Sequence, residues 1–289
     1  MRTSNDTPAV HVTGLRRSFG ALRAVDGLDL EVRRGEALGL LGPNGAGKTT
    51  TLRILSTLAS RDGGEVRVLG LDPATDGAAL RARIGVVPQE IALYSALTAR
   101  ENLEFFAAAH GVPRAKLGAR VDWALGVAGL ADRARSRVEG FSGGMKRRLN
   151  IVASMLHEPE LLFLDEPTAG VDPQSRNHVF DFVEALRAEG LTLIYTTHLM
   201  GEVERLCDRI VVMDRGRAVA AGTLAELQEL PTVKRALGAG LQLGAGVDLE
   251  RAAETLRAAG IAAEVRDTRP GLEEVFLALT GRALRDEEA

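Results

Sequence analysis

The segment 38–50 constrains this chain more than any other. An apolar run at 37–41 predicts a buried strand, and leucines at helical spacing predict a helix from Lys48 onward. Between them lies Gly42-x-x-x-x-Gly47-Lys48-Thr49, the pattern of a phosphate-binding loop. Its glycines let backbone N–H groups converge on phosphate oxygens, and the following helix points its positive end at the same anion. A glycine-rich turn that binds nothing is the alternative, and the flanking strand and helix argue against it.

The loop assigns different roles to its two last residues. Lys48 reaches the outer phosphates, and the Thr49 hydroxyl holds Mg²⁺. The sequence therefore predicts a nucleotide site. Its predicted binding residues in this stretch are Gly42, Pro43, Asn44, Gly45, Ala46, Gly47, Lys48, Thr49 and Thr50.

Composition excludes several classes of protein. The 289 residues are 45% hydrophobic, enough for a sizeable core, and a net charge of −3 offers no overall basic field for nucleic acid. The one cysteine, Cys207, fits a reducing compartment and is better explained as a small buried apolar residue than as a reactive thiol. No apolar run approaches the ~20 residues of a membrane helix, and the N-terminus lacks the apolar core of a signal peptide. We expect a cytoplasmic protein that can still dock on a membrane protein.

Hydrophobic periodicity predicts an α/β chain with a mostly helical insertion at 98–157. Apolar and acidic residues alternate at 28–32, which indicates an antiparallel strand with one solvated face. Thr98 and Glu101 form the pattern of a capping box at the start of a helix. The predicted strands are 10–15, 28–32, 65–68, 84–87, 161–164, 191–196, 209–213 and 217–221. The predicted helices are 98–109, 116–128, 145–156, 173–188, 200–206, 224–229, 249–259 and 272–279. The Gly- and Leu-rich residues 232–245 and the segment 261–265 are expected to add strands to a small C-terminal α+β domain.

Two carboxylates follow the apolar strand 161–164. Asp165 suits a role as a Mg²⁺ ligand beside Thr49, and Glu166 suits a role in orienting or activating the attacking water. A solvated acidic turn is the alternative. The phosphate-binding loop upstream favours the functional interpretation, because the carboxyl ends of parallel strands gather ligand-binding residues at one edge of a sheet.

A second candidate anion site is Ser142-Gly143-Gly144, at a predicted helix start. Backbone N–H groups and the hydroxyl there can bind an anion, although an ordinary helix N-cap explains the same residues. The order of the motifs decides between them. This one chain contains, in order, a phosphate-binding loop, a glutamine that follows a strand, a helix that starts at Ser-Gly-Gly, and a strand that is followed by Asp-Glu.

Over residues 10–222 this ordered set resembles the ATP-binding cassette (ABC) ATPases. The matching motifs are Walker A at 42–49, the glutamine loop at Gln89, the signature Phe141-Ser-Gly-Gly-Met145, Walker B at 161–165 followed by Glu166, the D-loop Ala169-Gly-Val-Asp172 and the switch histidine His198. The resemblance implies a P-loop NTPase fold: a mixed sheet with a helical subdomain (90–157) and an antiparallel β subdomain within 9–222. A loose tail at 1–8 and a small accessory domain at 223–289 flank it.

The resemblance also implies a mechanism with ATP and Mg²⁺ as cofactors. Two head-to-tail copies sandwich two ATPs, so each ATP touches Walker A of one chain and Ser142, Gly143 and Gly144 of the other. The D-loop residue Asp172 is a further implied nucleotide-binding residue. Phe19 matches the aromatic residue that stacks on adenine, with a core position as the alternative. Gln89, Glu166 and His198 are the implied catalytic residues, and Thr49, Gln89 and Asp165 the implied Mg²⁺ ligands.

Two signature residues, Phe141 and Met145, depart from the commonest Leu-Ser-Gly-Gly-Gln. The segment 142–149 (Ser-Gly-Gly-Met-Lys-Arg-Arg-Leu), together with 97–103 and 272–280, is similar to the daunorubicin-type drug exporters, a type 2 branch with separate membrane subunits. This similarity implies integral membrane permease partners, a homodimer on ATP binding, a position on the inner face of the membrane and no nucleic acid. A soluble ABC ATPase acting on DNA or ribosomes and a non-enzymatic nucleotide sensor are the alternatives.

Overall fold

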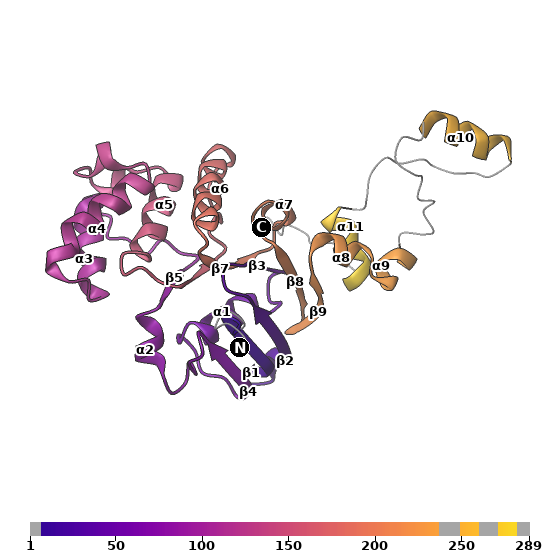
Figure 1. Cartoon of the computed structure of the whole chain (residues 1–289), viewed down its shortest axis with the longest axis horizontal. Coiled ribbons are helices and arrows are strands. Elements are labelled where there is room, and N and C mark those ends of the chain that lie inside the picture. Colours follow the sequence, from indigo (N-terminus) through magenta and orange to yellow (C-terminus); the bar gives the residue numbers. More distant parts are fainter. Residues whose placement is uncertain (1–6, 237–248, 260–270, 282–289) are drawn as a thin grey trace, which may run out of the picture. The chain divides into compact units, whose positions relative to one another are not determined.

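The structure is a computed structural model, and it describes residues 7–236, 249–259 and 271–281. The chain forms two compact units, residues 1–221 and residues 222–289 (Figure 1). None of the helices within the described ranges is both long and apolar enough to cross a bilayer.

A six-stranded sheet forms the centre of the first unit, with the order β5-β6-β7-β3-β8-β9. The strands are β3 (Ala37–Leu41), β5 (Ile84–Val87), β6 (Leu161–Asp165), β7 (Thr192–Thr197), β8 (Arg209–Asp214) and β9 (Arg217–Gly222). The four pairings from β5 to β8 are parallel, and a two-residue turn joins β8 to β9, which therefore runs antiparallel. The parallel strands β3, β6 and β7 are buried along their whole length, as expected where both faces of a sheet are covered.

A second, three-stranded antiparallel sheet has the order β2-β1-β4. Its strands are β1 (Val10–Phe19), β2 (Leu22–Val32) and β4 (Gly63–Val68). Within β2, residues 28–32 alternate between buried apolar and exposed acidic side chains, which confirms the predicted solvated face. The prediction of a mixed sheet plus an antiparallel β region is therefore confirmed.

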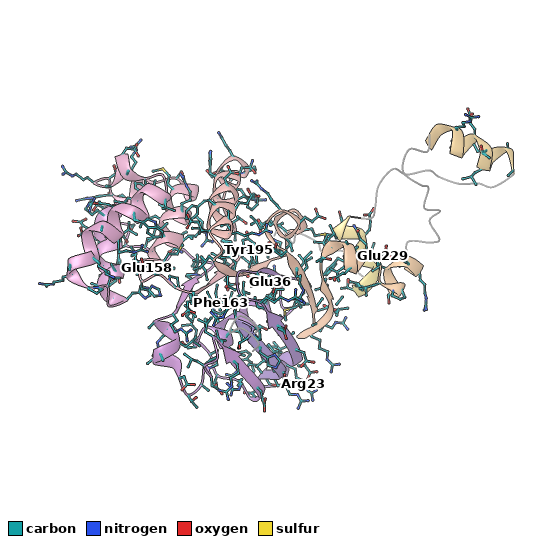
Figure 2. All side chains as sticks on the ribbon, viewed as in Figure 1. Arg23, Glu36, Glu158, Phe163, Tyr195 and Glu229 are labelled. Atoms are coloured by element: carbon teal, nitrogen blue, oxygen red, sulfur yellow. The ribbon has the colours of Figure 1, made fainter. Side chains whose placement is uncertain are left out.

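The central sheet separates two hydrophobic cores. Leu161 and Phe163 of β6 pack with the antiparallel sheet and with α1 (Lys48–Leu55). Leu162 and Leu164, which point the other way, pack with the helices on the opposite face. In Figure 2, Phe163 lies on the side of the antiparallel sheet and Tyr195 on the side of the helices.

Helices cover the second core (Figure 1). They are α3 (Ala99–Ala109), α4 (Arg114–Val127), α5 (Gly143–Ala153), α6 (Pro173–Ala188) and α7 (Met200–Leu206), and a short α2 (Gly77–Arg81) precedes β5. Thr98 and Glu101 form the predicted capping box at α3. The helix α5 begins two residues before the predicted start because Ser142 is its N-cap, so that Gly143 is already helical.

The second unit corrects one prediction. Its described elements are α8 (Leu224–Gln228), α9 (Pro231–Ala236), α10 (Leu249–Ala258) and α11 (Leu272–Thr280). Strands were expected from residue 232 onward, but Pro231 instead opens a helix, a position where its fixed φ and missing N–H are tolerated. The rest of that segment, 237–245, and the strand predicted at 261–265 lie outside the described residues, as do tail residues 1–6.

Candidate functional site

The phosphate-binding loop spans 42–47, between the end of β3 and the start of α1, as predicted. Gly47 has a φ of 101°, and a Cβ there would lie 2.4 Å from the Ala24 carbonyl oxygen, so only glycine fits. Asn44 and Gly45 at the loop tip are exposed, Pro43 is half-buried, and Gly42, Ala46 and Gly47 are buried. Thr49 and Thr50 follow in the first turn of α1 and are half-buried.

Lys48 is the buried cation of this loop, with only 4% of its surface exposed. Its ammonium group donates to the carbonyl oxygens of Gly42 (2.7 Å) and Pro43 (3.2 Å) and lies 3.4 Å from a carboxylate oxygen of Glu166. Burial lowers the pKa of Lys48, and the neighbouring Glu166 carboxylate opposes that shift. The loop thus contains a desolvated positive charge facing a carboxylate.

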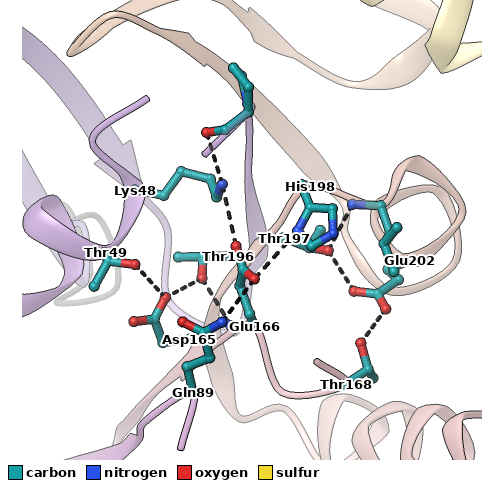
Figure 3. A network of polar contacts seen from close by, with 12 residues as sticks. Lys48, Thr49, Gln89, Asp165, Glu166, Thr168, Thr196, Thr197, His198 and Glu202 are labelled. Atoms are coloured by element: carbon teal, nitrogen blue, oxygen red, sulfur yellow. Dashed lines mark hydrogen bonds and ion pairs between the residues drawn. The ribbon is translucent and has the colours of Figure 1, made fainter. Parts of the chain in front are cut away.

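The ends of β6, β7 and α1 meet at Asp165 (Figure 3). One oxygen of its carboxylate accepts hydrogen bonds from Thr49 Oγ1 (3.1 Å) and Thr196 Oγ1 (2.6 Å). Residues 165 and 196 are partners in the parallel β6–β7 ladder, which explains how the sheet aligns them. The predicted pair Thr49–Asp165, 116 residues apart in the chain, is therefore brought together.

Glu166 is held by both its backbone and its side chain. Its φ of 43° is unusual for a residue with a side chain, and its N–H donates to both oxygens of Thr196, each at 3.1 Å. Its carboxylate lies 3.3 Å from His198 Nδ1 and 3.4 Å from Gln89 Nε2 (Figure 3). A hydrogen bond from His198, aided by the charge of Lys48, lowers the pKa of Glu166, so the carboxylate is ionised at neutral pH.

The Ser142 end of α5 has a different character. Ser142 and Gly143 are exposed, and Ser142 Oγ accepts a hydrogen bond from the Met145 N–H (3.3 Å). Gly144 is buried against α6, where a Cβ would lie 2.6 Å from Ser175 Cβ. None of the hydrogen bonds described for Ser142 joins it to Lys48, Asp165 or Glu166, so the single chain does not unite its two predicted anion sites.

Two further predicted residues lie at the start of α6 and the end of β1. Asp172 is the N-cap of α6 and accepts a hydrogen bond from the Ser175 N–H (2.9 Å), which lowers the pKa of Asp172. Phe19 is 52% exposed, with the Arg17 guanidinium 4.8 Å from its ring centroid. The alternative that Phe19 is a core residue is therefore wrong.

Comparison with known proteins identifies the family. The family model described as "ABC transporter" matches residues 25–169. The chain is 39% identical to the linearmycin resistance ATP-binding protein LnrL of Bacillus subtilis, over 94% of this chain and 98% of that protein. This chain belongs to the ABC transporter ATPase family. It is also 43% identical to the daunorubicin resistance ATP-binding protein DrrA3 of Streptomyces coeruleorubidus, over 97% of this chain and 98% of that protein.

Solved structures agree with the fold of this ABC ATPase. An ATP-binding subunit of an ABC transporter superposes with a TM-score of 0.71 at 28% identity, covering 95% of this chain and all of that one. The predicted ABC ATPase fold, the predicted ATP-binding ATPase activity and the similarity to the daunorubicin-type branch are thus confirmed.

Oxygen atoms dominate the candidate metal site of this ABC ATPase. The Thr49 hydroxyl and the Asp165 carboxylate are in contact, and the Gln89 side chain reaches the adjacent Glu166. Mg²⁺ prefers oxygen ligands and is commonly bound by one or two carboxylates together with substrate phosphates. The Thr49 hydroxyl and the Asp165 carboxylate are oxygen donors of this kind, so the residues present fit Mg²⁺.

Sequence reasoning missed three polar residues around this site. Thr196 aligns Asp165 and Glu166, and its signal was its position directly before Thr197 and His198 at the strand end. Arg147 belongs to the basic run Lys146-Arg147-Arg148, in which no pattern marks one residue as buried, yet it is buried and donates to backbone carbonyls near the site. Glu202 has no sequence signal, because nothing in a one-dimensional pattern shows which side chains it contacts.

Glu202 gathers three hydroxyl groups beneath His198. Its carboxylate accepts hydrogen bonds from Thr197 Oγ1 (2.6 Å), from the Tyr195 hydroxyl (3.0 Å) and from Thr168 Oγ1 (Figure 3). Burial raises the pKa of Tyr195, which therefore stays a neutral donor. This network ties the segment that leads to Asp172 to the strand end that carries His198.

Proposed function

We propose that this chain is the ATP-hydrolysing subunit of an exporter and powers efflux of a drug, antibiotic or lipid-like compound through separate membrane subunits. Relatives named for resistance to linearmycin and daunorubicin support this proposal over nearly the whole chain, and they favour it over a soluble ATPase acting on DNA or ribosomes. The observation that carries hydrolysis is the position of Glu166, an ionised carboxylate with Lys48 and His198 within 3.4 Å.

Each residue around Glu166 then has a defined role. The N–H groups of the 42–47 loop and the Lys48 ammonium bind the outer phosphates of ATP. Glu166 accepts the proton of the attacking water, and its lowered pKa keeps it in the basic form. His198 donates a hydrogen bond to the γ-phosphate and, through its contact with Glu166, fixes the direction of that carboxylate.

Thr49, Asp165 and Gln89 are proposed to hold Mg²⁺ through a hydroxyl, a carboxylate and an amide oxygen. When bound, the ion neutralises charge on the phosphate oxygens. Thr196 keeps the Asp165 carboxylate directed at Thr49, because both hydroxyls donate to the same oxygen.

A second copy of the chain is proposed to complete the site. Its Ser142, Gly143 and Gly144 offer a hydroxyl and the free N–H groups of a helix start to the phosphates bound at Lys48. Phe19 stacks on the adenine, which its exposure permits, and Asp172 lies in the same interface. Residues 9–222 form this nucleotide-binding domain, and 223–289 form an accessory domain.

The permease is proposed to dock next to Gln89. Ile91, Tyr94 and Phe105 are large apolar side chains with 39%, 50% and 46% of their surface exposed, and the rings of Tyr94 and Phe105 pack edge to face. Exposed aromatic residues of this kind are typical anchors of protein interfaces. Docking there places the subunit on the cytoplasmic face of the membrane and connects the permease to the Gln89 side chain.

Glu166→Gln tests the proposed chemistry. Because the variant keeps the shape of the side chain but loses the base, ATP turnover should fall by about a thousandfold while ATP still binds and traps a dimer. Glu158→Gln, at an exposed glutamate (Figure 2), is the matched control and should hydrolyse ATP like the unmodified protein. Normal turnover by Glu166→Gln would rule out the proposed base.

A further inference from the structure

Arg147 is a buried arginine inside the signature helix α5, with 1% of its surface exposed. Its Nη1 donates to the Pro88 carbonyl oxygen (2.8 Å), and its Nη2 donates to the carbonyl oxygens of Gln89 (2.7 Å) and Glu166 (3.1 Å). Among the described residues no carboxylate pairs with this guanidinium and its Nε has no hydrogen-bond partner, so the three carbonyls supply all of its hydrogen bonds. Because a buried charge is costly without such bonds, these carbonyls and the arginine fix one another.

The contact with Glu166 falls on a strained part of the backbone. The φ of 43° at Glu166 is unfavourable for a residue with a Cβ and persists only where its surroundings enforce it. Thr196 accepts hydrogen bonds from the N–H of Glu166, and Arg147 donates a hydrogen bond to the carbonyl oxygen of Glu166. The conformation that directs the Glu166 carboxylate is therefore held from both sides, by β7 and by α5.

The same guanidinium sets the position of Gln89 relative to Glu166. It holds the Pro88 and Gln89 carbonyls just beyond β5 and the Glu166 carbonyl just beyond β6. The two side chains are in contact, with Gln89 Nε2 3.4 Å from Glu166 Oε2. A lysine ammonium is a point charge and does not reproduce the planar fork that spans these three acceptors.

We propose that Arg147 is a positioning residue that ties the start of α5, at Ser142, to the residues that hydrolyse ATP in the same chain. Because the proposed function assigns Ser142 to one ATP of the dimer and Glu166 to the other, this inference rests on that function. Ser142 lies five positions before Arg147 on one helix, so a movement of the helix on binding the partner's ATP is transmitted through a rigid guanidinium to Glu166 and Gln89. Arg147 thereby couples the two sites.

Arg120 offers a matched control, because it is another arginine that donates to two backbone carbonyls of the helical region. Its acceptors are Leu156 (3.0 Å) and Met155 (3.0 Å), beyond the far end of α5. Loss of Arg120 removes comparable hydrogen bonds without touching Gln89 or Glu166. Comparing the two positions separates a general loss of packing from a loss of catalytic geometry.

The test compares Arg147→Lys, Arg147→Gln and Arg120→Gln with the unmodified protein, measuring kcat and KM for ATP and the fraction of dimer that forms with Mg-ATP. Both Arg147 variants should lose about tenfold in kcat, with KM changed by less than about twofold, because binding residues are intact and only the geometry of hydrolysis is disturbed. They should also accumulate as ATP-bound dimers. Arg120→Gln should lower the melting temperature and leave kcat and the dimer fraction unchanged.

Three results would overturn the inference: an unchanged kcat in folded Arg147→Gln, full recovery of kcat in Arg147→Lys, or an equal loss of kcat in Arg120→Gln. Should Arg147→Gln not fold, Arg147→Lys decides, because it retains the buried charge. The proposed function fails in a different way, namely if the unmodified protein neither hydrolyses ATP nor dimerises. These outcomes therefore distinguish the two proposals.

Discussion

The two proposed phosphate-binding ends of this chain are built in opposite ways. At the Lys48 end, side chains from α1, β6, β7 and the segment after β5 converge, and Lys48, Asp165 and Glu166 are 4%, 5% and 8% exposed. At the Ser142 end, Ser142 and Gly143 are exposed, and Ser142 accepts only local hydrogen bonds among those described, from the N–H groups of Met145 and Lys146. The first end is a closed network of charged groups, and the second is an open set of backbone donors.

This difference indicates that the two ends contribute to different steps of the reaction cycle. A dense, buried network holds its groups in fixed positions, which suits the chemistry of hydrolysis. An open helix start binds whatever anion is brought to it and releases it without breaking a network. We therefore expect damage at Lys48 to abolish nucleotide binding and damage at Ser142 to affect only steps that need two chains.

Lys48→Ala should give the largest effect. It removes the buried cation and the ion pair between Lys48 and Glu166, so we expect ATP hydrolysis to fall by about a thousandfold and ATP affinity by about a hundredfold or more. ATP binding by calorimetry and a phosphate-release assay measure the two quantities. Lys116→Ala, at an exposed lysine of α4, should change neither. ATP affinity that survives in Lys48→Ala would show that the closed end does not bind phosphate.

Ser142→Arg should be the next largest. The bulky cation blocks the open end, so cooperative hydrolysis should fall by about a hundredfold, while ATP binding by the single chain stays within about twofold. Ser142→Thr keeps an N-cap hydroxyl and should retain most of the activity. Hydrolysis is measured against protein concentration, because a two-chain site becomes active as dimers form. An unchanged, cooperative rate in Ser142→Arg would contradict the assignment of this end.

Glu202→Gln should reduce kcat by a smaller amount, about fivefold. It weakens three charge-assisted hydrogen bonds that align the strand end before His198, without removing any residue that contacts ATP in the proposed site. Glu204→Gln, two residues further along α7 and exposed, is the control. Equal rates for both variants would show that Glu202 does not support hydrolysis. The network that does so would then consist of Lys48, Asp165, Glu166 and their direct partners.

The smallest expected effect is a dependence of the free energy of unfolding on pH, which arises in the helical region that carries Ser142. The rings of His110 and His157 stack at 4.2 Å, and burial lowers the pKa of both, assisted for His110 by the charge of His157 and for His157 by that of Arg120. In the unfolded chain these histidines therefore take up protons first, near pH 6.5, and the free energy of unfolding decreases as the pH falls below that value. Since His110 is an exposed residue, we expect less than about 1 kcal/mol of stability to be lost.

Urea unfolding at pH 7.5 and 5.5 checks this prediction. The unmodified protein should lose stability on acidification, and His157→Gln should lose less. Glu166 itself should contribute nothing over this range, because its lowered pKa keeps it ionised. If the free energy of unfolding changed equally with pH in both proteins, the histidine pair would not be the cause of the change.

The sequence predicted the parts of the site that lie in short motifs. The loop around Lys48, the end of the strand at Asp165, the N-cap at Ser142 and the capping box at Thr98 each depend on residues a few positions apart. A local pattern therefore contains enough information to place them, although pairing Thr49 with Asp165 also required the parallel sheet.

Contacts between distant segments were not accessible in the same way. Arg147 reaches carbonyls 58 and 59 residues earlier in the chain, and Thr168 reaches Glu202 across 34 residues. Nothing in a run of three basic residues shows which one turns inward. Likewise, the helix predicted at 224–229 ends before Pro231, and the sequence does not show that Pro231 begins the next helix, because proline is compatible with both positions.

Mixing two inactive variants tests the central claim most directly. Lys48→Ala and Ser142→Arg damage opposite ends, so in a mixed dimer one site contains both lesions and the other contains none. If ATP is bound between the closed end of one chain and the open end of the other, the equimolar mixture should recover about a quarter of the normal ATPase rate, because half of the dimers are mixed and each has one intact site of two. A mixture no more active than the two variants measured separately would contradict this account.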